Sequence, residues 1–565
     1  MPERRVLRPG AAVVATLALL VTLTACVGIP NSGPVAVGLS LSAGSGGSNF
    51  EFNPEGPEKG AGQQKILTGF VASFTSATGG YAVAKQFLSA DFKDKWDPRQ
   101  SVQVRTGAPK IIQLSETTID YSFSTIATVD LSGAYKEGAQ STTLQFGFVR
   151  EAGQWRISAA PAGIVLADQT FKRIFSQHAL YFLDQTNEHL VPDLRWFPRG
   201  TAVTRIVSSV VLGPPAWLKG AAFSRFPDGT QLSATGSVVG TAGGVAKVDL
   251  TKEALAATPK ERQLMRLQLS ESLRSVSSIS SVSLSVEGTP LQIDDFGPSA
   301  PQADRKVDSQ ALVLRKGEFG FYANNKIAAL SQLSSKVVAL NPKAATLASD
   351  QSTVAVLGSA GVSVARKGSA LAPPLDTRDG LIAPSLDEYG YLWSVPTGNP
   401  NAITVFDVAG APHDVAPSLP LDALIRSLEV SREGSRVTIL LATTAGPRLI
   451  VAAILRDQKQ VPVSLGPPIV DISLSGGNAI DATWVDQWTV ATLVTVDGQS
   501  KVELFTVGGQ RVSLGSPLAP AAAIVGGNNG QDGLRVLGND SAIWAYSGSS
   551  WQSSKVTVDF IATQR

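Results

Sequence analysis

Residues 431–441 read Ser-Arg-Glu-Gly-Ser-Arg-Val-Thr-Ile-Leu-Leu, a polar turn followed directly by an apolar run. Short apolar runs bounded by Gly, Ser and Asp are typical of buried β-strands. The same order of turn and strand recurs in the C-terminal part of the chain at a spacing of about 40–50 residues, the length of a propeller blade. The other copies have their turns at 349–352, 386–390, 484–487 and 529–533.

This spacing predicts a β-propeller, in which each small sheet packs against its neighbours around a central axis. Three further apolar segments between residues 311 and 330 predict an additional blade, so we expect a six-bladed or similar propeller over residues 305–565. The composition agrees: the 565 residues include 53 Gly and 33 Pro, and 17% are charged. An average globular chain has about 25% charged residues, so this chain is turn-rich and weakly charged.

Residues 168–298 predict an α+β domain. An apolar run at 179–183 and a return strand at 189–197 come first, and then apolar residues recur at helical spacing from Val203 to Val211. Leu212-Gly213-Pro214-Pro215 supplies the glycine and proline that end helices. A Phe-Pro-Asp-Gly-Thr turn at 226–230 follows. The remaining expected elements are a strand at 248–250, a helix at 260–276 and a strand at 282–286.

This order of elements resembles the GerMN domain of spore-germination and envelope lipoproteins. The resemblance includes the Leu-Gly-Pro helix end, the Pro-Asp-Gly-Thr turn, the Val248-Asp249-Leu250 strand and the Val286-Glu287-Gly288 ending. GerMN domains have no established catalytic residues, so the resemblance implies a binding or assembly module.

Residues 63–167 predict another α+β domain. Ile66, Phe70 and Phe74 lie on one face of a helix, and a second amphipathic helix follows over 81–88. Alternating apolar residues then predict an antiparallel sheet that ends in Gly-Gln-Trp-Arg-Ile at 153–157. The pattern resembles the cone-shaped fold of the nuclear-transport-factor-two superfamily. The whole chain is therefore expected to be multidomain, α+β followed by all-β.

The N-terminus has the features of a targeting segment. Three arginines precede an apolar run at 11–23 that is too short for a membrane span, which predicts a signal peptide over residues 1–25. Leu23-Thr24-Ala25-Cys26 resembles the lipobox of bacterial lipoproteins. The resemblance implies cleavage between Ala25 and Cys26, with S-diacylglycerol and N-palmitoyl groups on Cys26. Half of the residues from 27 to 62 are Gly, Ser or Pro, so residues 26–62 are expected to form a lipidated flexible tether.

Several classes of chemistry lack their sequence signals. Cys26 is the only cysteine and there are three histidines, so a Cys/His zinc site cannot be assembled. The net charge of +2 argues against nucleic acid as a partner, because phosphate binding needs clustered Lys and Arg. The chain contains no Gly-x-Ser-x-Gly, His-Glu-x-x-His or Gly-Lys sequence. We expect no catalytic residues, no metal and no cofactor.

Some residues leave alternatives open. Asp387 with Glu388, or Asp376 with Asp379, could be the paired carboxylates of a propeller glycosidase, but acidic residues in turns more often cap hairpins. His178 and His189 could share a metal, although the sequence places no third ligand at a suitable spacing from them. His413 is expected in a loop. Six tryptophans could stack on sugars, anchor an interface or fill the propeller core: Trp217, Trp393, Trp484, Trp488, Trp544 and Trp551.

The complete layout resembles the LpqB family of bacterial lipoproteins, in the residues 29–35 after Cys26 and in Leu212-Gly213-Pro214. The resemblance implies a non-enzymatic lipoprotein on the extracytoplasmic face of the cell membrane. It also implies an accessory role in an Mtr-type two-component system, through binding to the extracellular domain of the sensor histidine kinase. The alternative is a protein that binds cell-wall glycan or peptide, or a propeller glycan hydrolase.

Overall fold

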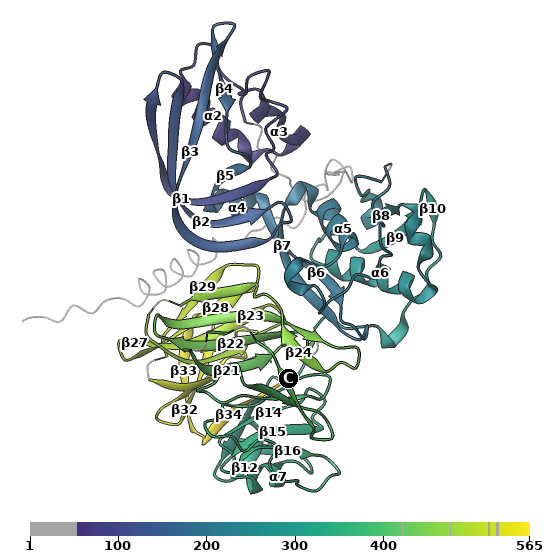
Figure 1. The fold of residues 1–565 in the computed structure, drawn as a ribbon, viewed down its shortest axis with the longest axis vertical. Helices are drawn as coiled ribbons and strands as arrows, with labels where there is room; N and C mark the ends of the chain where they lie inside the picture. Colours follow the sequence, from purple (N-terminus) through teal and green to yellow (C-terminus); the bar gives the residue numbers. More distant parts are fainter. Residues whose placement is uncertain are drawn as a thin grey trace, which may run out of the picture. The chain divides into compact units, whose positions relative to one another are not determined.

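The computed structural model describes residues 54–565, apart from residues 235, 305, 418, 421, 475, 518, 519 and 527–529. The predicted signal peptide, Cys26 and most of the predicted tether lie outside the described residues. The described part begins with an α+β region and a GerMN-like region and ends in an all-β region (Figure 1). The predicted fold class is therefore confirmed.

The first region packs two helices on a five-stranded sheet. The helices are α2 (Gln63–Ala72) and α3 (Thr78–Lys85). The strands, in sheet order, are β4 (Gln154–Ala159), β3 (Tyr135–Glu151), β2 (Thr118–Asp130), β1 (Ser101–Ser115) and β5 (Ile164–Ala167), and α4 (Asp168–Ile174) follows. The four predicted strands pair antiparallel as expected, and a fifth strand that was not predicted, β5, pairs with β1 in parallel. Gly163 permits this: its φ is +91°, and a Cβ there would lie 2.5 Å from the Ser101 carbonyl oxygen.

The second region begins with a hairpin of β6 (Phe175–Leu183) and β7 (Leu190–Pro198). Helices α5 (Ala202–Leu212) and α6 (Pro259–Leu273) and a three-stranded sheet complete it, so the predicted helices are confirmed. Thr258 and Glu261 form a capping box that fixes the start of α6. The sheet order is β10 (Thr289–Pro290), β9 (Ser281–Val286) and β8 (Val245–Leu250). Short 3₁₀ helices cover Ser73–Thr75, Arg199–Thr201, Ala216–Leu218, Ala242–Gly244, Lys252–Ala256 and Gly297–Ser299.

The third region consists of small sheets in chain order, with one short helix, α7 (Ser334–Ala339). The sheet strands before residue 420 are β11 (Ala311–Arg315), β12 (Glu318–Ala323), β13 (Lys326–Ala329), β14 (Ala344–Leu347), β15 (Thr353–Gly358), β16 (Gly361–Arg366), β17 (Ser385–Leu386), β18 (Leu392–Ser394), β19 (Ile403–Phe406) and β20 (Pro412–Val415). The later strands are β21 (Leu424–Val430), β22 (Arg436–Thr443), β23 (Gly446–Arg456), β24 (Pro462–Leu465), β25 (Val470–Ser473), β26 (Asn478–Trp484), β27 (Thr489–Val496), β28 (Gln499–Thr506), β29 (Arg511–Gly515), β30 (Ala521–Val525), β31 (Arg535–Gly538), β32 (Ala542–Ser547), β33 (Ser550–Thr557) and β34 (Phe560–Gln564).

These sheets form a propeller whose inner strands follow one another in a ring. Strand β14 contacts β17, β17 contacts β21, β21 contacts β26, β26 contacts β30 and β30 contacts β34. Strand β34 then pairs with both β14 and β11, so it completes the blade formed by β11, β12 and β13. The described strands thus build six blades, and the additional blade expected between residues 311 and 330 is confirmed.

The second region and the propeller share one apolar core. Trp217 and Leu218 of the GerMN-like region lie in the same cluster of buried side chains as Leu440, Leu449 and Trp484 of the propeller. Because apolar side chains from both regions are buried together, separating them would expose core to water. In the part of the chain that the structure describes, no helix is both long and apolar enough to cross a membrane.

Candidate functional site

Trp196 of β7 connects all three regions. Its backbone N–H donates to the Gly133 carbonyl of the first region over 2.8 Å, and its indole Nε1 donates to the Gly508 carbonyl of the propeller over 3.0 Å. Its ring lies 5.5 Å from that of Tyr135 and 5.0 Å from that of Phe171, between ring centroids. The β6–β7 hairpin is therefore the element on which the regions meet.

A buried ion pair lies beside Trp196 on the same strand. The Arg195 Nε donates to the Asp193 Oδ2 over 2.5 Å, and the Trp217 Nε1 donates to the Asp193 Oδ1 over 3.2 Å. Arg195 also donates to the Ser132 Oγ of the first region over 2.6 Å. Burial raises the pKa of Asp193, and the guanidinium opposes this rise. Removing one partner would leave an unpaired buried charge, so the pair stabilises the contact of the hairpin with Ser132 of the first region and with Trp217 of its own region.

A second polar cluster joins the hairpin turn to the propeller. The Tyr389 hydroxyl donates to the Asp184 Oδ2 over 2.7 Å, and the Arg456 guanidinium lies 4.0 Å from the centroid of the Tyr389 ring. Burial, together with the nearby Asp184 carboxylate, holds the pKa of Tyr389 well above its ordinary value. Tyr389 therefore stays a neutral hydrogen-bond donor. The His189 ring meets the Tyr389 ring edge-on, with centroids 6.2 Å apart.

The carboxylates proposed for glycan hydrolysis have structural partners. Asp387 accepts from the Arg456 Nη2 over 2.7 Å and from the Trp393 Nε1 over 3.0 Å. Asp376 accepts hydrogen bonds from the backbone N–H, the Nε and the Nη2 of Arg378, and one from the Ser394 hydroxyl. Burial would raise the pKa of Asp376, but these hydrogen bonds outweigh it and lower the pKa.

The neighbours of these two carboxylates are placed differently. Asp379 is exposed, whereas Glu388 lies with Asp387 in the wall of a cavity of about 390 Å³. Asp387 also accepts the backbone N–H groups of Tyr389 and Tyr391, as expected of an aspartate that closes a turn. Asp376 and Asp387 therefore serve the fold of the propeller, and Asp387 also joins its blade to Arg456 of the next blade.

The three histidines are placed separately by their hydrogen bonds and ring contacts. The His178 ring nitrogens lie 2.7 Å from the Ser176 Oγ and 2.8 Å from the Ser275 Oγ. Burial lowers the pKa of His178 to about 4, so its ring is neutral at pH 7. His413 lies in β20, the outer strand of its blade, so the loop predicted there was wrong. Pro412 is compatible with this strand because proline is tolerated at a strand's first residue. Among the described residues, no three His, Cys, Asp or Glu side chains are grouped closely enough for a metal.

The tryptophans divide by burial. Trp393 and Trp484 are fully buried, and Trp217, Trp544 and Trp551 are also buried, so these five belong to the core. Trp488 differs because it is partly buried and lines a groove. Of the six tryptophans considered from the sequence, it is therefore the one available to a ligand.

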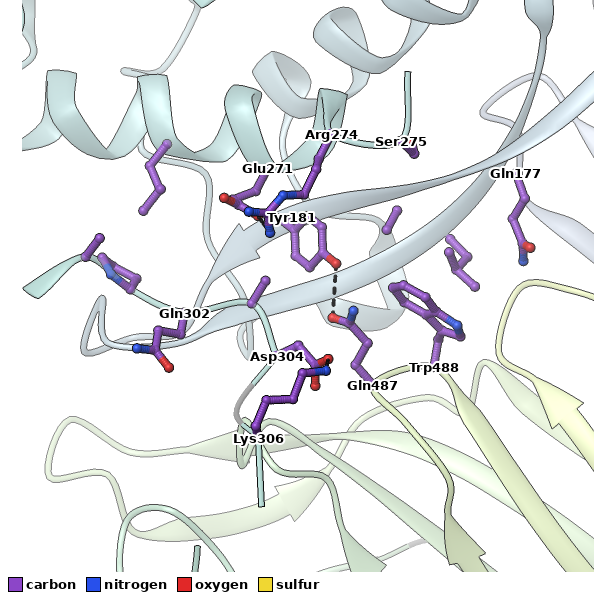
Figure 2. Close-up of a pocket in the computed structure, with 16 residues that line it drawn as sticks. Gln177, Tyr181, Glu271, Arg274, Ser275, Gln302, Asp304, Lys306, Gln487 and Trp488 are labelled. Carbon is purple, nitrogen blue, oxygen red and sulfur yellow. Dashed lines mark hydrogen bonds and ion pairs between the residues drawn. The ribbon is translucent and has the colours of Figure 1, made fainter. Parts of the chain in front are cut away.

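The groove that Trp488 lines lies between the GerMN-like region and the propeller (Figure 2). It has a volume of about 700 Å³, within the range of about 300–1,000 Å³ typical of ligand sites. Its walls are β6, the C-terminal half of α6, the segment 300–304 with Lys306, and the propeller turn that carries Gln487 and Trp488. The Tyr181 hydroxyl donates to the Gln487 Oε1 over 3.0 Å across its floor, and burial raises the pKa of Tyr181 to about 12.

Sequence patterns predicted the elements around this groove but only one of its side chains. Trp488 was recognisable as an aromatic residue near a turn. Gln177 and Arg274 carried no signal, because they belong to separate elements that approach only after the hairpin packs on α6 and the propeller.

These features define a class of protein: a β-propeller that carries a GerMN-like domain and a preceding α+β domain. Three family models match the chain, namely the N-terminal domain of lipoprotein LpqB at residues 56–172, the Germane domain of sporulation and spore germination at 179–292, and the β-propeller domain of lipoprotein LpqB at 319–559. The chain belongs to the LpqB lipoprotein family, as the resemblance predicted.

Curated relatives agree with this assignment. The chain is 25% identical over 555 residues to lipoprotein LpqB of Mycobacterium paratuberculosis, which covers 86% of this chain and 89% of the relative. It is 23% identical over 531 residues to lipoprotein LpqB of Rhodococcus opacus, covering 85% and 86%. The match to lipoprotein LpqB of Cutibacterium acnes is 29% identical over 296 residues, covering 52% of this chain and 48% of the relative. The chain thus spans about half the length of the first curated relatives it matches.

Solved structures with similarity to parts of the chain include TolB from Acinetobacter baumannii. It is 13% identical with a TM-score of 0.33, covering 45% of this chain and 66% of TolB. The first GerMN domain of the sporulation protein GerM from Bacillus subtilis is 20% identical with a TM-score of 0.18, covering 23% of this chain and 94% of that domain.

Proposed function

We propose that this chain is a lipid-anchored, non-enzymatic protein of the cell envelope that binds the extracellular domain of an Mtr-type sensor histidine kinase and modulates its signalling. In this proposal Cys26 carries S-diacylglycerol and N-palmitoyl groups and holds the protein on the extracytoplasmic face of the cell membrane. Two or three acyl chains give stable attachment, whereas a single chain is marginal.

Membership of the LpqB lipoprotein family supports this proposal. The observation that most directly favours binding over catalysis is the pairing of Asp387 with Arg456 and of Asp376 with Arg378. A carboxylate whose oxygens already accept hydrogen bonds from a guanidinium is poorly placed to transfer a proton to a substrate. The shared core of the GerMN-like region and the propeller also supports a docking role, because it gives a partner one continuous surface.

Binding to the kinase can be measured directly. Residues 27–565 are passed over the immobilised extracellular domain of the kinase, and we expect saturable binding by surface plasmon resonance. The matched control is the extracellular domain of a sensor kinase from another two-component system, which should bind at least about tenfold more weakly, a difference of about 1.4 kcal/mol.

The same protein is incubated with purified cell-wall polymer to test the alternative. We expect the polymer to keep its length and to release no soluble sugar. Saturable glycan binding without any binding to the kinase domain would contradict the proposed partner, and release of sugar fragments would contradict a non-enzymatic role.

The anchor has its own test. Cys26→Ser removes the thiol that acylation requires, so we expect the variant to lose labelling by an alkyne analogue of palmitate and to leave the detergent phase in Triton X-114 partitioning. Ser32→Ala is the matched control, because it changes the neighbouring segment and keeps the cysteine. Unchanged labelling and partitioning of Cys26→Ser would exclude Cys26 as the acylated residue.

A further inference from the structure

The edge of β6 that faces away from β7 borders the groove lined by Trp488 (Figure 2). In an antiparallel pair, successive residues alternate between bonding to the partner strand and facing away from it. The Leu183 N–H donates to Phe223 rather than to β7. Trp196 of β7 is paired with Gln177 of β6, yet its N–H donates to Gly133 rather than to β6. These two bonds show which residues of β6 face away from β7: the backbone N–H and C=O groups of its odd-numbered residues point to the free edge.

Part of this edge is already occupied. Leu183 exchanges hydrogen bonds with Phe223. At Tyr181, the N–H donates to the Ser272 Oγ over 2.9 Å and the carbonyl accepts from the Gln268 Nε2 over 3.1 Å, so side chains of α6 take the place of a neighbouring strand.

Helix α6 ends at Leu273, and the next two outward residues of β6 are Ala179 and Gln177, which both line the groove. Within the described residues, no hydrogen bond from α6 or the propeller to their backbone groups is found. An edge strand whose backbone N–H and C=O groups lack protein partners is suited to a ligand that supplies both donors and acceptors.

We propose that the groove binds an extended peptide segment of a second protein, which adds to β6 as a third strand through the backbone N–H and C=O groups of Ala179 and Gln177. Addition of a strand to an open sheet edge is a recurring mode of peptide recognition, in which main-chain bonds supply affinity and side-chain pockets supply selectivity. Donors and acceptors spaced along one strand fit a peptide backbone better than they fit a sugar.

The side chains of the groove indicate the composition of that segment. Glu271 pairs with Arg274 over 3.1 Å, and Asp304 pairs with Lys306, so the charges of these lining residues cancel. Leu194, Leu267 and Trp488 add an apolar wall. The segment is therefore uncharged, with at least one large apolar side chain that packs against Trp488. This inference does not depend on the identity of the partner proposed above.

A peptide library tests the proposal on the intact protein. Phage that display random linear heptapeptides are panned against the full lipidated chain in detergent, and we expect enrichment of uncharged sequences with an apolar residue. The best peptide is synthesised with single backbone N-methyl groups. Since one edge of the peptide faces β6, methylation at alternate residues should weaken binding by about tenfold or more, and methylation between them by less than about twofold. Equal tolerance at every residue, or no enrichment, would overturn the proposal.

A variant of β6 gives a second readout. Ala179→Pro removes the N–H that faces the groove and leaves the bonds to β7 intact, and it should weaken binding of the selected peptide by about tenfold. Ala179→Ser is the matched control, because it retains the N–H and should change affinity by less than about twofold. Peptide binding should also slow amide hydrogen exchange in residues 175–183 of the unaltered chain. Unchanged exchange there, or equal affinity for a folded Ala179→Pro variant, would overturn the proposal. If Ala179→Pro lowers the melting temperature, the proposal is judged on the N-methylated peptides and on the hydrogen exchange of the unaltered chain.

Discussion

At the scale of single residues, Tyr389 tests how firmly the propeller holds the hairpin turn. Tyr389→Phe removes the hydrogen bond to the fully buried Asp184 carboxylate and keeps the packing on Arg456. We expect the free energy of unfolding in urea to fall by about 1–3 kcal/mol, the cost of an unmade bond to a buried charged group. Tyr322→Phe removes a solvent-exposed hydrogen bond to Asn325 and serves as the control, with an expected change within about 0.5 kcal/mol. Equal effects of the two changes would show that the Tyr389 bond adds no stability.

Asp481 of β26 makes the stability of the folded protein depend on pH. Burial raises the pKa of Asp481 to about 7, although the N–H groups of Ile524 and Ala482 donate to it, and nearby Glu429 raises it further. Between about pH 4 and 7 the folded protein therefore holds a proton that the unfolded chain has lost. The contribution of Asp481 to stability is highest below about pH 4 and falls as the pH rises toward 7. Asp481→Asn should remove this fall. We expect the fall in the free energy of unfolding to be on the order of 2 kcal/mol, because Asp481 is partly exposed and water screens part of the effect.

Melting temperatures of the wild type and Asp481→Asn between pH 4.5 and 7.5 measure the effect. The difference between the two proteins should change across this range in favour of the variant. The control is Asp91→Asn, an exposed aspartate of the first region, whose melting temperature should run parallel to the wild type. Parallel curves for Asp481→Asn as well would mean that Asp481 is ionised in the folded protein at acidic pH.

At the scale of elements, the end of α5 depends on Gly213. Its φ of +103° and ψ of −179° lie in a region open almost only to glycine. Gly213→Ala should lower the free energy of unfolding by about 1–3 kcal/mol, measured by urea titration. Gly200→Ala is the matched control, because the added methyl would meet no atom within 4 Å and the backbone there has no positive φ. A Gly213→Ala variant as stable as Gly200→Ala would show that the helix end adapts without strain.

The elements that the sequence predicts best are those with a local cause. The end of α5 follows from Leu212-Gly213-Pro214-Pro215, and the blades follow from a repeated turn and strand. His413 was misplaced because the Pro412 beside it suggested a loop, whereas an outer strand of a blade accepts proline at its first residue. The parallel pairing of β5 was missed because it depends on the close approach of Gly163 to Ser101, a contact between distant residues.

At the scale of the whole molecule, the candidate groove could not be predicted from the sequence. Its residues lie on β6, β7, α6, the segment 300–304 with Lys306, and a propeller turn, and none of these carries a local pattern that marks a binding surface. Trp196 shows the same difficulty, since an aromatic residue in an apolar strand predicts core, and here the core it enters belongs to a neighbouring region. Contacts between domains depend on tertiary packing, which periodicity along one element does not report.

The position of Trp196 predicts how the regions unfold. Its ring packs in the core of the first region while its Nε1 donates to the propeller, so truncation should weaken the coupling between them. We expect Trp196→Ala to lower stability by about 3–5 kcal/mol and to separate an early calorimetric transition of the first region from the main one. Trp155→Ala changes a partly buried residue within the first region. It should shift the melting temperature of the first region without changing the coupling of that region to the propeller. A single transition in Trp196→Ala, as sharp as that of the wild type, would show that the other contacts of the β6–β7 hairpin, such as the bond from Arg195 to Ser132, are sufficient to couple the regions.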